Sequence, residues 1–410
     1  MTPEVVFNPF DPEFVADPYP TFRKQRAHCP VFVGPMGMVF VFGYDDVSSV
    51  LRDPSLSIDD RNATNSLRMI EISSMFREWA ERGAHSILNL DPPDHTRLRR
   101  LLAPAFAPRT IARLHDRVDR IIERTLDRLA DAERTTGEPT ELIDAFASHV
   151  PFTVISDLLG VPTSGRDELL AWSHTLTLAL EPMVVPDDVE AIRHAGDSIL
   201  ARMTDLIAWK RSHPADDLLT SLLMAEDDGD TLSELELVDQ VSLMYIAGHE
   251  TVVNLLGNGV WHLLRHRAQF ERLTADATLA ANAVEEILRF DSPIQFARRI
   301  PLADAVVGGQ TVAAGSTILL GLASANRDDA RFGPDADVFD VTRSDAADHL
   351  SLGSGIHYCL GAALARLEGT AALASLARRF PDMALVDGHE VRNGRMMLRG
   401  FDRLPVRLVG

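Results

Sequence analysis

One stretch of this 410-residue chain, from Ser233 to about Arg265, constrains the fold more than any other. Ser233 and Glu236 form an S-x-x-E pattern, in which both side chains cap the first turn of a helix. A helix of roughly 30 residues, at ~1.5 Å per residue, is about 45 Å long, which is the width of a whole domain. Its middle, VSLMYIAG, is apolar on nearly every side. We therefore expect a helix buried through the centre of the protein.

The rest of the chain indicates a mainly helical fold with little sheet. Apolar residues recur with helical spacing from His95 to Leu223, interrupted by prolines. A hairpin is predicted from Val31–Val33 and Met38–Phe42, and a second near Val306–Val312. The segment 317–326, TILLGLASAN, fits either a strand or a buried helix. No strand, glycine-rich loop and helix follow one another as a dinucleotide site requires.

Charge and cysteine content exclude several classes of protein. Asp and Glu number 60 against 40 Lys and Arg, a net charge of −20, which disfavours binding to nucleic acid or to an anionic membrane. Cys29 and Cys359 are the two cysteines, too few for a disulfide framework or a four-cysteine metal site. The N-terminus does not resemble a signal peptide, and no apolar run is long enough to span a membrane. We expect a cytoplasmic protein.

Cys359 lies in a glycine-rich loop, HLSLGSGIHYCLG, directly before a predicted helix that begins near residue 362. Gly353 and Gly361 permit close approach of the backbone, and free amides at a helix start stabilise a thiolate. Three interpretations fit these residues. The cysteine could be structural, it could be a nucleophile with His349 or His357 as base, or it could be the single axial thiolate of a haem iron.

Polar residues interrupt the long helix at Ala247–Thr251, AGHET. Gly248 weakens the helix by about 1 kcal/mol relative to alanine, which indicates that something packs against the backbone there. Thr251 can bond back to the carbonyl of Ala247 and bend the helix. An acid, Glu250, followed by an alcohol at a buried bend could relay protons to a bound oxygen species. A weakened core helix with a back-bonded threonine is the alternative interpretation.

Two further pairs are less specific. Glu286 and Arg289 lie three residues apart on one face of a predicted helix, a spacing typical of a surface ion pair worth under about 1 kcal/mol. His95 and Arg99 project to one side of a helix that starts after Pro93. Arginine there suits a carboxylate such as a haem propionate, although a basic surface stripe explains the pair equally well.

Taken together, these segments resemble the cytochrome P450 family of haem-thiolate monooxygenases, in particular its soluble bacterial members. HLSLGSGIHYCLG is similar to the haem-binding loop of that family, and AGHET to its oxygen-activating helix. EILR, with Arg343 in VFDVTR, is similar to its Glu–Arg–Arg triad. The resemblance runs from the DPYP start to the LPVRL end. It implies a predominantly α fold with a small β region and one haem-binding domain, residues 1–410, without a fused reductase or a membrane anchor.

The resemblance also implies roles for individual residues. Cys359 would be the proximal ligand of haem b, and Glu250 with Thr251 would organise the protons delivered to dioxygen. Arg298 stands next to Arg299 and could take its place at a propionate. Haem contacts are implied for His95, Arg99, Ala247, Gly248, Arg299, Gly353, His357, Cys359 and Gly361. The structural triad would be Glu286, Arg289 and Arg343.

The substrate pocket is expected to lie beside the long helix. The residues expected to line it are Leu243, Met244, Ala247, Ile294, Phe296, Ala297 and Phe401. Segments 61–89 and 176–186 are expected to form a lid. One departure concerns Leu352, seven residues before the cysteine, where the family most often has phenylalanine. Its smaller side chain could alter the shielding of the sulfur.

The implied activity is the insertion of one oxygen atom from dioxygen into an apolar or amphipathic small molecule, with hydroxylation as the default. Electrons would come from a separate ferredoxin or flavodoxin with its reductase. We expect that partner to dock at Arg99, Arg100 and the helix behind Cys359. The alternatives are a peroxygenase that uses hydrogen peroxide and a non-catalytic haem sensor. The acid–alcohol pair, Glu250 and Thr251, argues against both.

Overall fold

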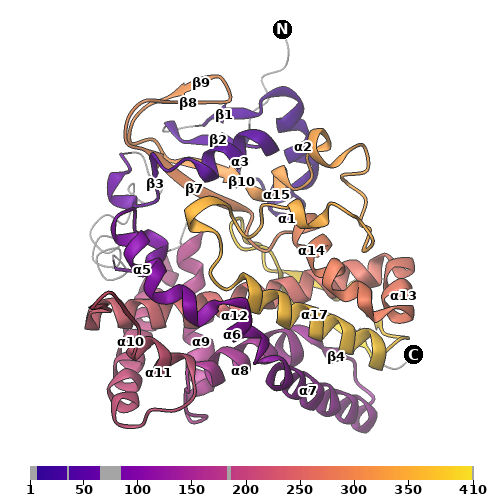
Figure 1. The fold of residues 1–410 in the computed structure, drawn as a ribbon. Coiled ribbons are helices and arrows are strands. Elements are labelled where there is room, and N and C mark those ends of the chain that lie inside the picture. Colours follow the sequence, from indigo (N-terminus) through magenta and orange to yellow (C-terminus); the bar gives the residue numbers. More distant parts are fainter. Residues whose placement is uncertain (1–6, 35–36, 65–84, 182–185, 409–410) are drawn as a thin grey trace.

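The structure, a computed structural model, describes residues 7–34, 37–64, 85–181 and 186–408. Figure 1 shows a helical layer below and a smaller β-rich layer above, in which the first helices and several strands gather. The fold class expected from the sequence, predominantly α with a small β region, is confirmed.

The long central helix is α12 (Glu234–Arg265). It begins as expected, because the Ser233 amide donates to Glu236 Oε2 at 2.8 Å and the Glu236 amide donates to Ser233 Oγ at 3.3 Å. Five longer helices pack against α12: α8 (His149–Leu158), α9 (Arg166–Thr177), α10 (Pro186–Ser212), α14 (Ala280–Phe290) and α17 (Ala362–Arg379). Packing from several sides explains why the middle of this helix can be so apolar.

Further helices complete the two layers. In the helical layer these are α5 (Asp94–Leu102), α6 (Pro108–Ala112), α7 (His115–Thr136), α11 (Leu218–Leu223) and α13 (Arg267–Ala275). In the β-rich layer they are α1 (Pro12–Ala16), α2 (Tyr19–His28), α3 (Tyr44–Arg52), α15 (Leu322–Ala325) and α16 (Asp329–Phe332). Single 3₁₀ turns join several of them, among them η7 (Leu178–Leu180) and η10 (Gly355–His357).

The main sheet has five strands from two distant parts of the chain. Its order is β1 (Val31–Val33), β2 (Val39–Val41), β10 (Ile318–Gly321), β7 (Phe296–Pro301) and β3 (Leu56–Ser57). β1 and β2 form the predicted antiparallel hairpin, and β2 then pairs with β10 in parallel. The ambiguous segment TILLGLASAN forms a strand and then a helix, because β10 ends at Gly321 and α15 follows directly.

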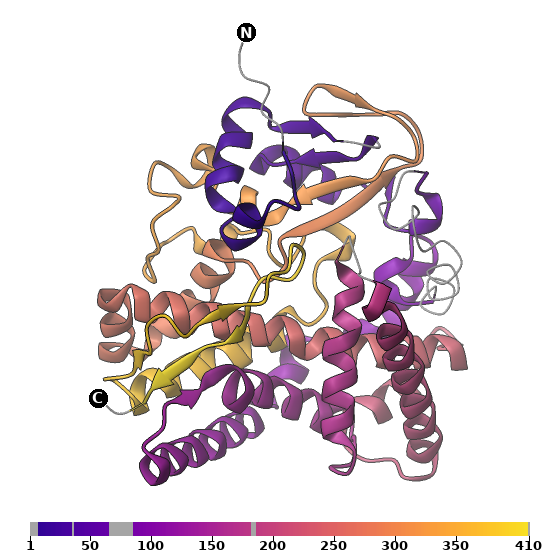
Figure 2. The ribbon, with the colours of Figure 1, turned by 180° about the vertical axis from the view of Figure 1, so that it is seen from behind.

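Four smaller sheets lie around this framework. They are β11 (Ala384–Leu385) with β14 (Pro405–Arg407) and β4 (Thr140–Glu141), β12 (Val391–Arg392) with β13 (Phe401–Arg403), β5 (Glu226–Asp227) with β6 (Asp230–Thr231), and β8 (Ala305–Val307) with β9 (Gln310–Val312). The last pair is the second predicted hairpin. Figure 2 shows the loop between β12 and β13 reaching across the helical layer toward the β-rich layer.

The two segments expected to form a lid fall partly outside the described residues, at 65–84 and 182–185, so the lid stays a prediction. Within the part of the chain that the structure describes, none of the helices is both long and apolar enough to cross a membrane.

Candidate functional site

Cys359 lies between the 3₁₀ turn η10 and the first turn of α17. Its amide donates to the carbonyl of Leu352 at 2.9 Å, which closes the loop on itself. Gly353 and Gly355 have φ of 72° and 70°, a conformation that glycine adopts without strain. A Cβ on Gly355 would lie 2.9 Å from the backbone oxygen of Leu51. The loop is therefore seated directly on the end of α3.

The Cys359 thiol experiences opposing influences. Burial raises its pKa, while the amide of Gly361 and the charges of Arg99 and Arg366 act in the opposite direction. A thiol in this setting binds a metal only after losing its proton, and the amide and the two cations are arranged to stabilise the resulting thiolate. The structure thus provides one sulfur ligand with built-in support for its negative charge.

Cationic and imidazole groups gather near this loop. The rings of His95, on α5, and His357, on the cysteine loop, lie 4.2 Å apart. Burial, followed by the charges of His95, Arg299 and Arg99, lowers the pKa of His357 to about 3. Burial, followed by the charge of Arg298, lowers the pKa of Arg299 to about 10. Both pKa values are lowered because positive charges lie close together in a buried region. A bound anion would offset the repulsion among these charges.

The two adjacent arginines differ in their partners. Arg298 forms an ion pair with Asp60 at 3.0 Å and donates to Asn89 at 3.2 Å. Arg299 donates only to backbone carbonyls in the described structure, those of Arg298 and Leu51, at 2.8 and 3.2 Å. Arg299 is therefore the arginine better able to bind a further carboxylate.

The residues present fit a haem. Nε2 of His95 is buried and has no hydrogen-bond partner among the described residues, so it suits a propionate oxygen. On α12, the face formed by Leu243, Ala247 and Thr251 is accessible although its neighbours are buried. An accessible, mainly apolar helix face of this kind can border a flat apolar group.

The threonine of the AGHET segment bonds back to the helix as expected. Thr251 Oγ1 donates to the carbonyl of Ala247 at 3.0 Å. Gly248 is expected at the cofactor, and the structure also shows a protein neighbour that limits the size of the residue at this position. A Cβ there would lie 3.1 Å from Ile155 Cδ1 on α8, so a close helix crossing accounts for this glycine.

Glu250 is nearly buried and has a partner that the sequence did not indicate. His174, on α9, places Nδ1 3.0 Å from Glu250 Oε1. Burial alone would raise the pKa of Glu250, but the hydrogen bond from His174 and the nearby histidines and Arg395 bring it below its ordinary value. The carboxylate is therefore charged and is held on the accessible side of α12.

The loop between β12 and β13 is bound to the same region. Arg395 donates to Thr177 Oγ1 at 2.8 Å and its Nη2 lies 3.2 Å from Nε2 of His174. The Glu181 carboxylate accepts the amides of Met396 and Met397 at 2.8 and 3.1 Å. These contacts join α9, the 3₁₀ turn η7 after it and the C-terminal hairpin beside α12.

The residues expected in the substrate pocket separate into three groups. Leu243, Met244 and Ala247 lie on or beside the accessible face of α12. Ile294 and Ala297, partly buried just before and at the start of β7, pack against the apolar core around β2 and β10, and Ile294 pairs with Leu398 of the hairpin loop. The other two lie in different surroundings. Phe296 packs against Phe22 and Phe40 in the aromatic core of the β-rich layer, and Phe401 packs against Trp261 and Arg392.

The Glu–Arg–Arg group is a buried ion cluster, not the surface pair that its spacing alone suggested. Arg289 donates to both oxygens of Glu286, at 2.7 and 2.9 Å, and both side chains are fully buried. Arg343 Nε lies 3.6 Å from Glu286 Oε1. Arg289 also donates to the carbonyls of Asn326 and Ala336, so the cluster fastens α14 to the segment before the cysteine loop.

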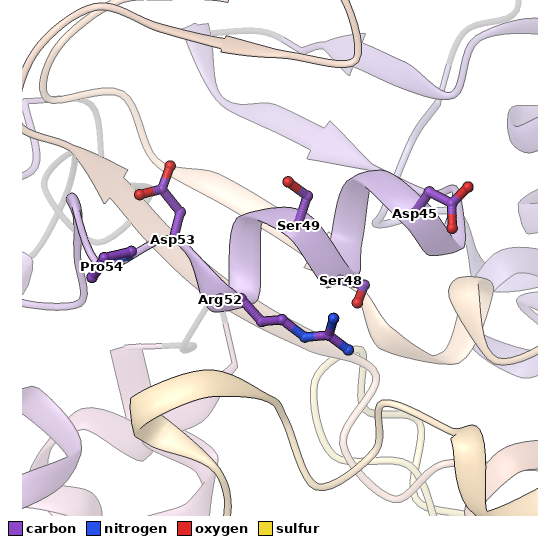
Figure 3. Close-up of a pocket in the computed structure, with 6 residues that line it drawn as sticks. All are labelled: Asp45, Ser48, Ser49, Arg52, Asp53 and Pro54. Atoms are coloured by element: carbon purple, nitrogen blue, oxygen red, sulfur yellow. The ribbon is translucent and has the colours of Figure 1, made fainter.

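A shallow pocket on α3 is separate from these groups. Its lining residues are Asp45, Ser48, Ser49, Arg52, Asp53 and Pro54. Figure 3 shows Ser49 and Asp53 on one side of the helix and Arg52 on the other. Arg52 donates to Ser354 Oγ at 3.0 Å, so this helix supports the cysteine loop through a side chain as well as through its backbone.

Comparison with known proteins shows the family to which the chain belongs. The Cytochrome P450 family model matches residues 19–388, and the chain belongs to that family. It is 39% identical over 403 residues to the cytochrome P450 monooxygenase PikC of Streptomyces venezuelae, covering 96% of this chain and 92% of PikC. It is 39% identical over 407 residues to the vitamin D(3) 25-hydroxylase of Pseudonocardia autotrophica, covering 97% and 96%.

A solved structure agrees as well. The cytochrome P450 PksS of Bacillus subtilis superposes with a TM-score of 0.87 at 33% identity, covering 99% of this chain and all of that one. The protein is therefore a haem b enzyme, a monooxygenase that hydroxylates small organic molecules.

Proposed function

We propose that this P450 oxidises an apolar or amphipathic small molecule on the α12 side of the haem, with Cys359 as iron ligand and with Glu250 and Thr251 supplying protons. The observation that carries the proposal is the α12 face itself. A charged, nearly buried carboxylate and a threonine hydroxyl are adjacent on α12, next to the accessible residues Leu243 and Ala247 of the same helix.

The overall reaction needs both groups. It is RH + O₂ + 2 e⁻ + 2 H⁺ → ROH + H₂O, so one oxygen atom enters the substrate and the other leaves as water. Haem b bound at Cys359 supplies the iron chemistry that activates dioxygen. His95, Arg99, His357 and Arg299 would hold the propionates. Leu243 and Ala247 would exclude water from the substrate, and Thr251 would direct protons held at Glu250 toward the dioxygen side.

The Thr251→Ala variant tests the proton role. We expect haem content and substrate affinity to stay within about twofold of wild type, because Thr251 bonds only to the helix carbonyl of Ala247 in the described structure. Product per electron consumed should fall severalfold, with hydrogen peroxide released in place of water. Hydroxylation with unchanged coupling would show that Thr251 has no part in proton delivery.

We propose a bulky, mainly apolar substrate. Leu243, Met244 and Ala247 offer no charge. Two relatives carry the names vitamin D(3) 25-hydroxylase and 6-deoxyerythronolide B hydroxylase. The test is a screen of secosteroids, macrolactones and fatty acids for a spin-state shift of the ferric protein. A shift produced by small charged compounds alone would contradict the proposed class.

We propose a separate acidic ferredoxin or flavodoxin as electron donor, acting in the cytoplasm. The expected docking residues need revision, because Arg100 pairs with Asp227 at 3.2 Å and Arg366 on α17 is bonded to Glu285. Arg109 and Arg113, exposed on and just after α6, form no ion pair within the described structure. Helix α6 packs against α17, directly behind the cysteine loop.

Charge reversal tests this docking surface. The double variant Arg109→Glu, Arg113→Glu should raise the KM for the donor protein by about tenfold at low ionic strength, with the difference shrinking as salt screens the charges. Substrate affinity should not change. An unaltered KM would place the docking site elsewhere.

A further inference from the structure

The side chain that contacts the Glu250 carboxylate is far more exposed than the carboxylate itself. The carboxylate is 7% exposed as a residue, whereas the side chain of His174, which contacts it, is 56% exposed. The contact joins α9 to α12, two helices that pack along one another. One end of the imidazole thus touches the carboxylate, while more than half of the side-chain surface of His174 is accessible.

The hydrogen bonds determine which nitrogen of this imidazole carries the hydrogen. Arginine can only donate, so the contact between Arg395 Nη2 and His174 Nε2 makes Nε2 an acceptor. A neutral imidazole with Nε2 as acceptor carries its hydrogen on Nδ1, and Nδ1 faces Glu250 Oε1 at 3.0 Å. The ring is therefore already in the form that can pass a proton from Nδ1 to Glu250 once Nε2 receives another.

We propose that His174 is the entry group through which solvent protons reach Glu250. The inference rests on the proposed role of Glu250 and extends it outward to the protein surface. Each turnover consumes two protons, and a nearly buried carboxylate that gives up a proton needs a group that can return it. Imidazole suits this task because it accepts and donates a proton on different atoms.

The step balances without any further reactant. A hydronium ion or buffer acid in solvent gives a proton to Nε2, which releases Arg395 from that atom. The Nδ1–H bond then breaks and an O–H bond forms at Glu250 Oε1. The ring is left neutral with its hydrogen on Nε2, and exchange with water at both nitrogens restores the starting form.

Arg395 opposes the transfer of a solvent proton to Nε2 of His174. Its charge faces Nε2, and it is held by Thr177 Oγ1 at 2.8 Å and is 9% exposed. The other titratable groups facing this region are Glu250 and His249 on α12 and Glu181 at the end of η7. Arg395 therefore acts as a positioning residue that orients the imidazole and competes with a solvent proton for Nε2.

The primary test is His174→Gln, whose amide can still donate to Glu250 but cannot relay a proton. Hydrogen peroxide delivers the oxygen together with its two electrons and two protons, so it bypasses the relay. With any compound that shifts the ferric spin state as substrate, we expect at least a tenfold loss of dioxygen-supported turnover. Peroxide-supported turnover should stay within about threefold. The matched control is His194→Gln, an exposed histidine on α10, which should leave both rates unchanged.

The pH profile of a second variant gives an independent readout. Dioxygen-supported turnover of the wild type should fall as the pH rises, because the proposed step begins with transfer of a solvent proton to Nε2 of His174. Arg395→Gln removes the cation that competes for Nε2, so this fall should move to higher pH. In His174→Gln the rate should be low and the fall absent.

The outcomes separate the two proposals. Equal loss of dioxygen- and peroxide-supported turnover in His174→Gln would make His174 merely structural, and wild-type rates in both assays would also overturn the inference. If Thr251→Ala and Glu250→Gln uncouple the enzyme while His174→Gln does not, only the entry role of His174 fails. If all three variants stay coupled, the proposed role of Glu250 and Thr251 fails as well.

Discussion

At the scale of single residues, the fold depends on charges that have no contact with water. Arg289 and Glu286 are fully buried and neutralise each other, and Arg343 adds a second cation at 3.6 Å. Burying an ion is costly unless a partner compensates it. Each side chain therefore depends on the other. Removing one of them alone should lower the free energy of unfolding far more than removing a charged side chain from the surface.

Arg289→Met should lower the free energy of unfolding by about 3–5 kcal/mol, because it leaves Glu286 buried without its bidentate partner. Denaturant unfolding of the haem-loaded protein measures this. Arg134→Ala is the control, since Arg134 and Asp131 form an exposed pair worth less than about 1 kcal/mol. Equal effects of the two substitutions would show that the buried cluster contributes no more than a surface pair.

The thiolate itself gives a second prediction at this scale. Cys359→Ser should remove the red-shifted Soret band that the carbon monoxide complex of the reduced protein shows when sulfur is the ligand. The fold should survive, because the cysteine loop is held by its backbone bond to Leu352 and by α3. A red-shifted band that persists in the variant, or is missing from the wild type, would contradict Cys359 as ligand.

At the scale of elements, the cysteine loop packs against the backbone at the end of α3. Gly355 combines φ of 70° with a position where a Cβ would meet Leu51 O at 2.9 Å and Arg52 Cα at 3.1 Å. Both neighbours are backbone atoms, so neither can rotate away. The loop can lie this close to the helix because residue 355 is a glycine and has no side chain.

Gly355→Ala should cost about 1–2 kcal/mol for the left-handed conformation and about 1–3 kcal/mol more for the clash. It should also weaken haem retention, because the loop must move away from α3. Gly388→Ala separates the two costs: Gly388 has φ of 75° but nothing within 4 Å of its Cβ. Haem content after gel filtration and the midpoint of unfolding are the measurements. Equal losses of haem content and stability in both variants would show that the contact with α3 leaves room for a methyl group at residue 355.

Elements defined by local sequence were predictable, and contacts across the chain were not. The capping box fixed the start of α12 because both of its partners lie within four residues. His174 and Glu250 are 76 positions apart, and nothing in either local pattern pairs them. Phe296 and Phe401 were expected in the pocket, but their directions depend on strand register. Pairing of Phe296 with Gly321 in the sheet turns its ring toward the aromatic core.

At the scale of the whole molecule, Asp291 at the end of α14 joins both layers. It binds His262 of α12 at 2.9 Å, Arg399 of the C-terminal hairpin at 2.9 Å and Tyr19 of α2 at 2.7 Å. Burial, only partly offset by Asp291, lowers the pKa of His262 to about 4. This histidine therefore stays neutral in the folded protein at pH values where the unfolded chain would protonate it.

Stability should depend on pH through this residue. Between pH 4 and the ordinary histidine value of 6.5, the unfolded state binds a proton that the folded state does not, so the free energy of unfolding rises with pH in that window. His262→Gln should reduce the slope by up to one proton, about 1.4 kcal/mol per pH unit. Unfolding curves at several pH values measure this. An unchanged slope would show that His262 titrates normally in the fold.

The order of strands in the main sheet also has a consequence for how the protein is made. β1, β2 and β3 are complete once residue 57 has left the ribosome, but β10 and β7, which lie between β2 and β3, follow about 240 residues later. At roughly 5–20 residues per second the early strands wait about 10–50 s for their neighbours. During that time the apolar Val39–Val41 has only β1 to pair with. We therefore expect the yield of folded protein to depend on translation speed as well as on the stability of the finished enzyme.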